Sequence, residues 1–202
     1  MHGLLSSSIT FVFASEDYAF HRTLVPHIKA ANQHDALLGT PMGYNDKRYT
    51  NYGLVFYEAG YWKEAEQLNV QVLETRKRVL GEGHPSMLMS LVSLVSTYRN
   101  QGWWKEAEQL DVQVLEMRKR VLGEEHPDML TSMANLALTY RNQGQWKEAE
   151  QLDVQVLETT KRVLGEEHPH MLMSMGNLAS TYRNLGWWKE AEQPQVQVSE
   201  MR

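Results

Sequence analysis

The stretch Trp146-Lys-Glu-Ala-Glu-Gln151 decides the fold, because the same six residues begin again at Trp62, Trp104 and Trp188, at intervals of 42 residues. A repeat of this length is one supersecondary unit that cannot bury its apolar face alone. Neighbouring copies must therefore stack and share one core, as in a solenoid. The sequence predicts a tandem array whose function lies on its surface.

Residues that are typical of helix starts and helix ends predict two helices in each repeat. In the third repeat, Pro127 at the first turn needs no hydrogen-bond partner, and Asp128 adds negative charge at the positive end of the helix dipole. Helix A is predicted from Pro127 to about Asn142. Helix B is predicted from Trp146 until Gly165, and both helices carry apolar residues at steps of three and four.

Residues 1–42 form an N-terminal segment, partly helical, outside the repeat pattern. The mostly apolar stretch Leu4 to Ala14 has no Lys or Arg before it, and it is too short to span a membrane. We expect a strand or a buried helix there rather than a secretory signal. Residues Glu16 to His34 predict a helix that Pro26 kinks or divides, and Gly39 to Gly43 marks the boundary before the array.

The four repeats differ in how completely we expect them to fold. In the first, Thr50 and Gly53 replace better packing residues of helix A, yet we expect the helix to form. In the last, which is truncated, Pro194 replaces a leucine inside helix B, where proline costs roughly 3 kcal/mol. This end is therefore expected to fray. We assign the repeats to residues 43–84, 85–126, 127–168 and 169–202.

The C-terminal end of the array is predicted to lack a polar capping helix. An uncapped solenoid exposes the apolar side of its terminal helix A, so it tends to self-associate or to continue in a longer parent protein. The residues expected on this exposed side are Leu172, Met175, Leu178 and Tyr182.

Composition and charge exclude several functional classes. Hydrophobic residues make up 42% of the chain and charged residues 22%, which is ordinary for a globular protein and argues against disorder. The net charge is −5, and the basic residues alternate with Glu, which is not the footprint of a nucleic-acid-binding protein. Cysteine is absent, which suits a reducing compartment. We predict a cytoplasmic protein that binds neither nucleic acid nor membrane.

No group of residues predicts catalysis, a cofactor or a metal site. The sequence has no nucleophile motif and no His-Glu-x-x-His pattern. His84, His126 and His168 each precede a proline and lie just after acidic residues. Equivalent side chains of packed helices lie roughly 10 Å apart, too far to share one ion. We predict that these histidines cap helices or pack loops, and that the protein is not an enzyme.

The series Leu136, Ala137, Tyr140, Gly144 and Trp146 resembles the tetratricopeptide pattern of apolar, small and aromatic residues across two helices. The 42-residue period, with its tail Lys-Arg-Val-Leu-Gly-Glu-Glu-His-Pro, is similar to the kinesin-light-chain type of this repeat. The resemblance implies an all-α fold, a right-handed α-solenoid of antiparallel helix pairs. It also implies structural roles for the repeated Trp and Ala residues, namely Trp62, Trp104, Trp146, Trp188, Ala65, Ala107, Ala149 and Ala191.

The third repeat carries a narrower resemblance. Its segment from Ser132 to Gly144 is similar to the C-terminal repeats of fungal NOD-like receptors, in which the array follows a nucleotide-binding ATPase domain of the NB-ARC or NACHT type. The stretch His21 to Ile28 resembles the segment that joins this ATPase to the array. The sequence has no Gly-rich phosphate loop, so the ATPase itself is missing.

The tetratricopeptide resemblance implies a peptide-binding groove lined by the A helices. In members that bind peptides, an Asn at the place of Asn135 commonly contacts the backbone of an extended segment, and an amide can donate and accept together. The Arg residues of the groove would meet acidic side chains or a carboxylate terminus; alternatively they are solvated or pair with Glu of an adjacent repeat. The predicted groove residues are Asn51, Ser93, Arg99, Thr131, Asn135, Leu138, Arg141, Asn142, Asn177 and Arg183.

Polar residues stand where many tetratricopeptide repeats place an aromatic residue, seven positions after the repeated Trp. We expect these polar side chains to bond a neighbouring side chain rather than a ligand. The residues are Asn69, Asp111, Asp153 and Gln195.

We predict a non-catalytic scaffold that binds a protein or peptide, as the sensor or interaction region of a NOD-like-receptor-type system. Two alternatives remain. One is a cargo or complex adaptor like kinesin light chain, which would bind a short peptide in the groove. The other is a self-assembling structural element, or an eroded fragment with no specific ligand.

Overall fold

The computed structural model describes residues 15–37 and 47–192, and within these ranges all regular secondary structure is helical. The chain divides into two compact units, Met1–Trp103 and Trp104–Arg202. The predictions made for residues 4–14, for the boundary at 39–43, and for Pro194 and Gln195 lie outside the described residues.

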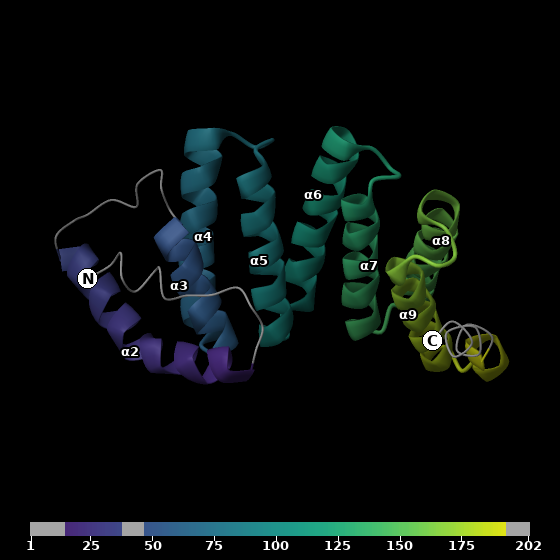
Figure 1. The fold of residues 1–202 in the computed structure, drawn as a ribbon, viewed down its shortest axis with the longest axis horizontal. Coiled ribbons are helices and arrows are strands. Elements are labelled where there is room, and N and C mark those ends of the chain that lie inside the picture. Colours follow the sequence, from purple (N-terminus) through teal and green to yellow (C-terminus); the bar gives the residue numbers. More distant parts are fainter. Residues whose placement is uncertain (1–14, 38–46, 193–202) are drawn as a thin grey trace. The chain divides into compact units, whose positions relative to one another are not determined.

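The first unit is a stack of antiparallel helices in which each helix packs against the next one along the chain (Figure 1). Helix A of the first repeat forms, as predicted, although it is the shortest helix of the unit. The helices are α2 (Ser15–Leu37), α3 (Lys47–Glu58), α4 (Trp62–Leu80) and α5 (Pro85–Gln101).

Helix α2 belongs to the core of the first unit. Leu24, Val25 and Ile28 are buried on one face and join the cluster around Tyr52 and Phe56. These three follow the three-and-four spacing of an amphipathic helix. The helix runs three residues further than predicted and is not divided at its proline, although its ribbon changes direction along its length (Figure 1). Burial of the apolar face outweighs the single hydrogen bond that a proline removes.

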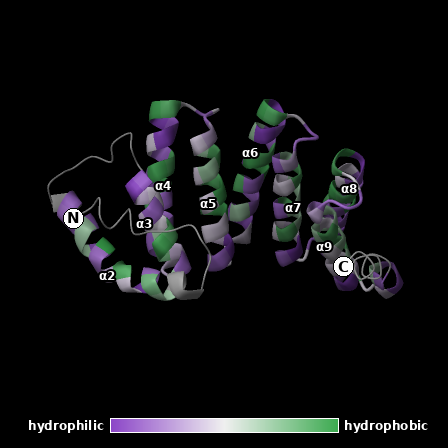
Figure 2. Cartoon of the chain, in the orientation of Figure 1, coloured by the Kyte–Doolittle hydropathy of each residue, from purple (hydrophilic) through white to green (hydrophobic). Residues whose placement is uncertain are grey.

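The second unit contains the third repeat, whose helices begin and end where the sequence predicted. Consecutive helices pack against one another, and α7 also contacts α9. In Figure 2 hydrophobic and hydrophilic residues alternate along each helix, which is the pattern of elements buried on one side. The helices are α6 (Trp104–Leu122), α7 (Pro127–Asn142), α8 (Trp146–Leu164) and α9 (Pro169–Asn184).

Histidine side chains cap the A helices, which confirms the predicted capping role. At the start of α7, the Nδ1 atom of His126 accepts a hydrogen bond from the backbone N–H of Asp128 at 3.1 Å. This satisfies one of the N–H groups that the first turn leaves without a helical partner. The same bond joins His84 to Ser86 and His168 to His170.

The repeated small and aromatic residues differ in burial. The repeated alanines are inaccessible to solvent, at 0% exposure for Ala65, Ala107 and Ala149 and 2% for Ala191. Such positions admit no larger side chain where two helices cross. The repeated tryptophans are partly exposed, and the fraction reaches 64% at Trp188.

The apolar side of α9 does not match the prediction of an exposed end. Met175 and Leu178 are 6% and 4% exposed and are therefore buried within the chain, while Leu172 and Tyr182 are half-buried. The exposed apolar residue of this helix is instead Met173, at 65%. The prediction was wrong for the two buried residues, because their side of α9 is already covered within the protein.

Candidate functional site

A hollow of about 350 Å³ lies among three helices of the second unit. Helices α7 and α9, the A helices of two successive repeats, supply most of its lining, and α8 supplies the rest. Five of the predicted groove residues take part. These are Thr131, Asn135, Leu138, Arg141 and Asn177.

Helical spacing explains why these residues come together. Thr131, Asn135 and Leu138 follow one another by four and three positions, so they lie on one face of α7. Asn177 stands one repeat after Asn135 and reaches the hollow from α9. Leu138 and Met173 add apolar surface at the rim, with 37% and 65% of their area exposed. The hollow therefore combines two amide side chains with aliphatic and thioether surface.

The other predicted groove residues lie elsewhere. Ser93 and Arg99 are on α5 of the first unit, Asn142 donates to the backbone oxygen of Leu138 in its own helix at 2.8 Å, and Arg183 is exposed on α9. Asn51, on α3, is only 3% exposed. It was predicted to present its amide to a ligand, and its burial in the core of the first unit prevents this.

Arg141 forms a buried ion pair rather than offering a free cation. Its Nη1 atom lies 2.8 Å from Oδ2 of Asp153, and the two side chains are 10% and 1% exposed. Arg141 also donates to the backbone oxygen of Asn177 and to Thr181 Oγ1, and Thr181 donates to the same Asp153 oxygen at 2.6 Å. Arg141 is therefore already neutralised by an acid of its own repeat, and an acidic ligand would have to displace Asp153 to meet it.

A buried polar bond recurs between repeats at the position of Asp153. Thr139 donates to Asp111 at 2.6 Å, and Asn69 donates to Thr97 at 3.2 Å, each pair being 28 residues apart. The polar residues that replace the usual aromatic thus bond a neighbouring side chain, as predicted. Each of them links helix B of one repeat to helix A of the next.

The carboxyl group of Asp153 makes stability depend on pH. Burial raises its pKa, and the hydrogen bond from Thr181 and the charge of Arg141 oppose this only in part. The folded state therefore holds the proton more tightly than the unfolded state does. The contribution of Asp153 to the free energy of unfolding is thus greatest at low pH and falls as pH rises from the ordinary carboxyl range through the raised pKa.

We expect the Asp153→Asn variant to lose this contribution, because an amide does not titrate. Relative to that variant, the unaltered protein should gain free energy of unfolding as the solution is acidified. Urea unfolding of both proteins across a pH series measures the difference. A difference that grows in the opposite direction, with the unaltered protein favoured at high pH, would contradict the assigned pKa direction.

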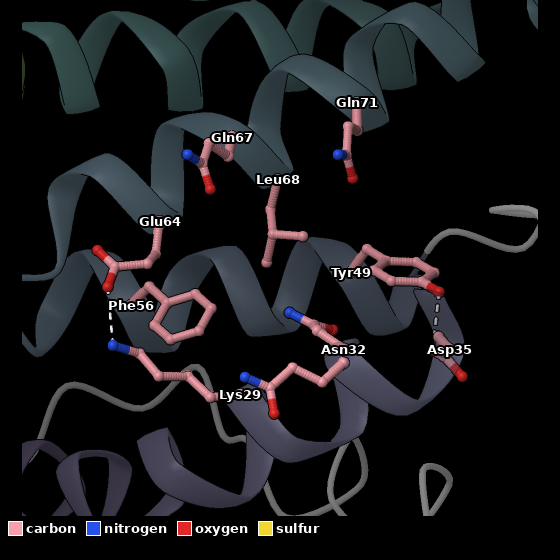
Figure 3. Close-up of a pocket in the computed structure, with 10 residues that line it drawn as sticks. Lys29, Asn32, Asp35, Tyr49, Phe56, Glu64, Gln67, Leu68 and Gln71 are labelled. Atoms are coloured by element: carbon pink, nitrogen blue, oxygen red, sulfur yellow. Dashed lines mark hydrogen bonds and ion pairs between the residues drawn. The ribbon is translucent and has the colours of Figure 1, made fainter. Parts of the chain in front are cut away.

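A second hollow, of about 480 Å³, lies in the first unit between α2 and the helices α3 and α4 (Figure 3). Lys29 donates to Glu64 at 2.8 Å and lowers its pKa. Tyr49 donates to Asp35 at 2.9 Å, and burial together with this bond raises the pKa of Tyr49. Arg48 completes the group, 3.1 Å from Asp35. These contacts hold α2 against the first repeat.

Sequence reasoning missed this second hollow. Its lining comes partly from α2, and nothing in the repeat pattern indicates where a helix outside the pattern will dock. The spacing of the apolar residues Leu24, Val25, Ile28 and Ala31 by three and four positions was the available signal, because it marks a helix face that needs a partner.

Two further features of the described part of the chain bear on other functions. Across residues 15–37 and 47–192, no cluster of three or more His, Asp or Glu side chains is arranged to hold a metal ion. Over the same ranges no helix has the length and apolar character needed to cross a membrane.

Comparison with known families identifies the repeats. The model of the tetratricopeptide repeat family matches residues 47–86, 87–128, 129–170 and 171–202. These segments make up more than half of the chain, so the protein belongs to the tetratricopeptide repeat family. The predicted fold class, an all-α solenoid of tetratricopeptide type, is confirmed.

The chain is similar to solved structures of kinesin-light-chain-type repeats. It is 28% identical to the nearly identical TPR-like repeats of a kinesin-light-chain-type protein from Podosopora anserina, with a TM-score of 0.78, covering 99% of this chain and 92% of that one. A variant form of that protein gives a TM-score of 0.79 with the same identity and coverage. BtubC (BKLC) from P. vanneervenii is 15% identical with a TM-score of 0.73, covering 92% and 77% of the two chains, and shows the fold alone. A comparison with curated protein sequences gives no significant match.

Proposed function

We propose that the hollow of the second unit binds an extended peptide segment of a partner protein, and that the chain is a non-catalytic interaction scaffold. The observation that supports this most is the meeting of Asn135 and Asn177, from two successive A helices, around one hollow. The amide of Asn135 can donate to and accept from a peptide unit. Asn177, whose Oδ1 accepts from Arg141 Nη2 at 3.5 Å, keeps its NH₂ group to donate.

The spacing of the two A helices suits an extended chain. Packed helices lie roughly 10 Å apart, which is the length of about three extended residues. A segment lying across α7 and α9 would therefore meet one amide and, about three residues later, the other. Leu138 and Met173 would receive apolar side chains between these points.

The charge of the hollow restricts its ligand. Arg141 lines the hollow, but Asp153 neutralises it within the protein. An acidic peptide would gain little from an arginine already paired, and it would have to break a buried ion pair to gain more. The proposed ligand is therefore not acidic at the positions that enter the hollow.

Removing one amide tests this proposal. Peptides selected from a random decapeptide library on the full chain should bind the Asn135→Ala variant about tenfold more weakly, because one hydrogen-bonding side chain is lost at the contact. The matched control is Asn142→Ala, since that amide bonds its own helix outside the hollow. Affinities come from fluorescence anisotropy. Equal affinities for Asn135→Ala and the unaltered protein would refute the assignment of the hollow.

For the cellular role there are two candidates, the two kinds of protein that the sequence resembles. We propose a sensor or interaction region of a NOD-like-receptor-type system in the cytoplasm. A kinesin-light-chain-like adaptor is the second candidate, supported by the similarity to the repeats from Podosopora anserina. An adaptor would select one short motif from the library, whereas a self-assembling element would select none and would instead show mass that rises with concentration in light scattering.

A further inference from the structure

At the hollow, one position of the repeat has a different type of side chain from the equivalent positions of earlier repeats. Position 160 of α8 is threonine, whereas the equivalent residues one and two repeats earlier are Arg118 and Arg76. The flanking residues Lys161 and Arg162 keep the residue types of the other copies. The difference therefore concerns one side chain in an otherwise matching stretch of helix B.

The two arginines fill the same place in their own repeats. Arg76 donates through Nη1 to the backbone oxygen of Ser86 at 2.9 Å and to Ser90 Oγ at 2.7 Å. Arg118 donates through Nη1 to the backbone oxygen of Asp128 and to Ser132 Oγ, both at 2.7 Å. In both cases a guanidinium joins helix B to the first turns of the following helix A.

Helix α9 carries the same two acceptors after position 160. Ser174 stands at the place of Ser90 and Ser132, and it donates to the backbone oxygen of His170 at 2.9 Å. The corresponding serine bonds in the other repeats are 3.2 Å and 3.1 Å long. The serine hydroxyl and the backbone oxygen are thus arranged alike in the three repeats. The threonine at position 160, however, has no guanidinium that could donate to them.

The hollow lies where that guanidinium would be. Thr160, His170 and Ser174 all line it. The hydroxyl of Thr160 is buried, with the residue only 1% exposed, and its Oγ1 has no hydrogen-bond partner within the described residues. Ser174 is also buried, at 5% exposure. A buried hydroxyl without a partner is costly and marks a place where a polar group can be received.

We propose that the hollow binds an arginine side chain of the bound peptide. The guanidinium of the peptide would take the place that the guanidinium groups of Arg76 and Arg118 fill in their own repeats. This rests on the proposed peptide-binding function. The guanidinium would donate to the backbone oxygen of His170 and to the hydroxyl oxygens of Ser174 and Thr160. A planar fork of donors reaches several acceptors at once, which a lysine ammonium does less well.

The charges around the hollow permit a cation. Arg141 is neutralised by Asp153, so it does not leave a free like charge beside the incoming guanidinium. Between residues 104 and 192 acidic side chains outnumber basic ones. None of the residues that line the hollow is acidic, so it is the net negative charge of the unit that favours a positively charged side chain over a negative one.

The small probe N-acetyl-arginine N-methylamide tests the site, with the neutral citrulline analogue as its control. In NMR titrations of the full chain, the arginine probe should bind about tenfold more tightly than the citrulline analogue, since hydrogen bonds from a charged donor are the stronger ones. Thr160→Arg should abolish this binding, because the protein's own guanidinium then occupies the hollow. Gln155→Arg, which adds the same side chain at an exposed position of α8, should leave binding unchanged.

A second variant separates loss of the site from loss of folding. Thr160→Val keeps the shape of the side chain but removes the hydroxyl, so it should weaken the arginine probe while leaving the thermal transition of the protein in place. Equal binding of the arginine and citrulline probes, or arginine binding that survives in Thr160→Arg, would overturn the proposal.

The library peptides distinguish this proposal from the proposed function. Selected peptides that depend on Asn135 but keep their affinity when arginine is replaced by citrulline would support the groove and overturn the arginine site. Binding of the small probe without any peptide that depends on Asn135 would support the arginine site and overturn the peptide groove.

Discussion

Replacing Asp153 by alanine is expected to lower the free energy of unfolding of the second unit by about 3 kcal/mol at neutral pH, because it leaves a largely buried Arg141 without its counter-charge. The two side chains are 1% and 10% exposed. Thr181 would also lose the closer of its two acceptors and keep only the backbone oxygen of Asn177. Burial disfavours the charged form of Asp153. The alanine variant is still expected to be less stable, because it removes the carboxylate and leaves the buried Arg141 without a partner.

The change can be located by hydrogen exchange. Backbone amides of α7, α8 and α9 should exchange faster in Asp153→Ala, while those of α3 and α4 keep their rates, because energetic effects in repeat proteins pass mainly between neighbours. Glu166→Ala is the control, since it breaks the exposed contact of Glu166 with Lys161, where solvent screens the charges. If Asp153→Ala and Glu166→Ala had the same effect, the buried pair would not have the structural role assigned to it.

Replacing Phe56 by alanine is expected to destabilise the first unit by about 3 to 5 kcal/mol, the usual cost of emptying the space of a buried aromatic ring. Phe56 is 2% exposed and lies in one cluster with Ile28 of α2 and Leu68 of α4. The ring also borders the hollow beside α2 (Figure 3). Loss of the ring should therefore loosen the docking of α2 as well as the contact between α3 and α4.

Phe20→Ala is the matched control for this variant. The ring of Phe20 is on α2 but is 44% exposed, so its removal should change the free energy of unfolding by much less. Urea unfolding gives the size of each change, and hydrogen exchange of the α2 amides shows whether the helix opens. Protection of α2 that stays the same in Phe56→Ala would show that α2 does not belong to this core.

The repeated parts of the fold could be predicted because their signals are local. Pro127 and Gly165 define the beginning of helix A and the end of helix B in the third repeat, and the structure has these elements at Pro127–Asn142 and Trp146–Leu164. At Gly165 the backbone φ is 89°, which a residue without Cβ adopts at little cost. The capping histidines and the polar bond of Asp153 also followed from their positions in the repeat.

What could not be predicted depends on contacts between side chains of different helices. The docking of α2, the burial of Asn51 and the pairing of Arg141 with Asp153 depend on which neighbours a side chain meets after the helices pack. The arginine-to-threonine change at position 160 was visible in the sequence as a difference between copies. Its meaning was not visible, because only the structure shows that Arg76 and Arg118 occupy equivalent space.

The threonine at position 160 has a consequence for how a ligand is aligned. A protein made of near-copies presents the same surface more than once, so a ligand that contacts only recurring features can shift by one copy and find equivalent contacts again. In the two earlier repeats Arg76 and Arg118 fill the equivalent space, so a ligand side chain cannot bind there. The substitution at 160 thus breaks the translational symmetry of the array and gives a bound segment a single register.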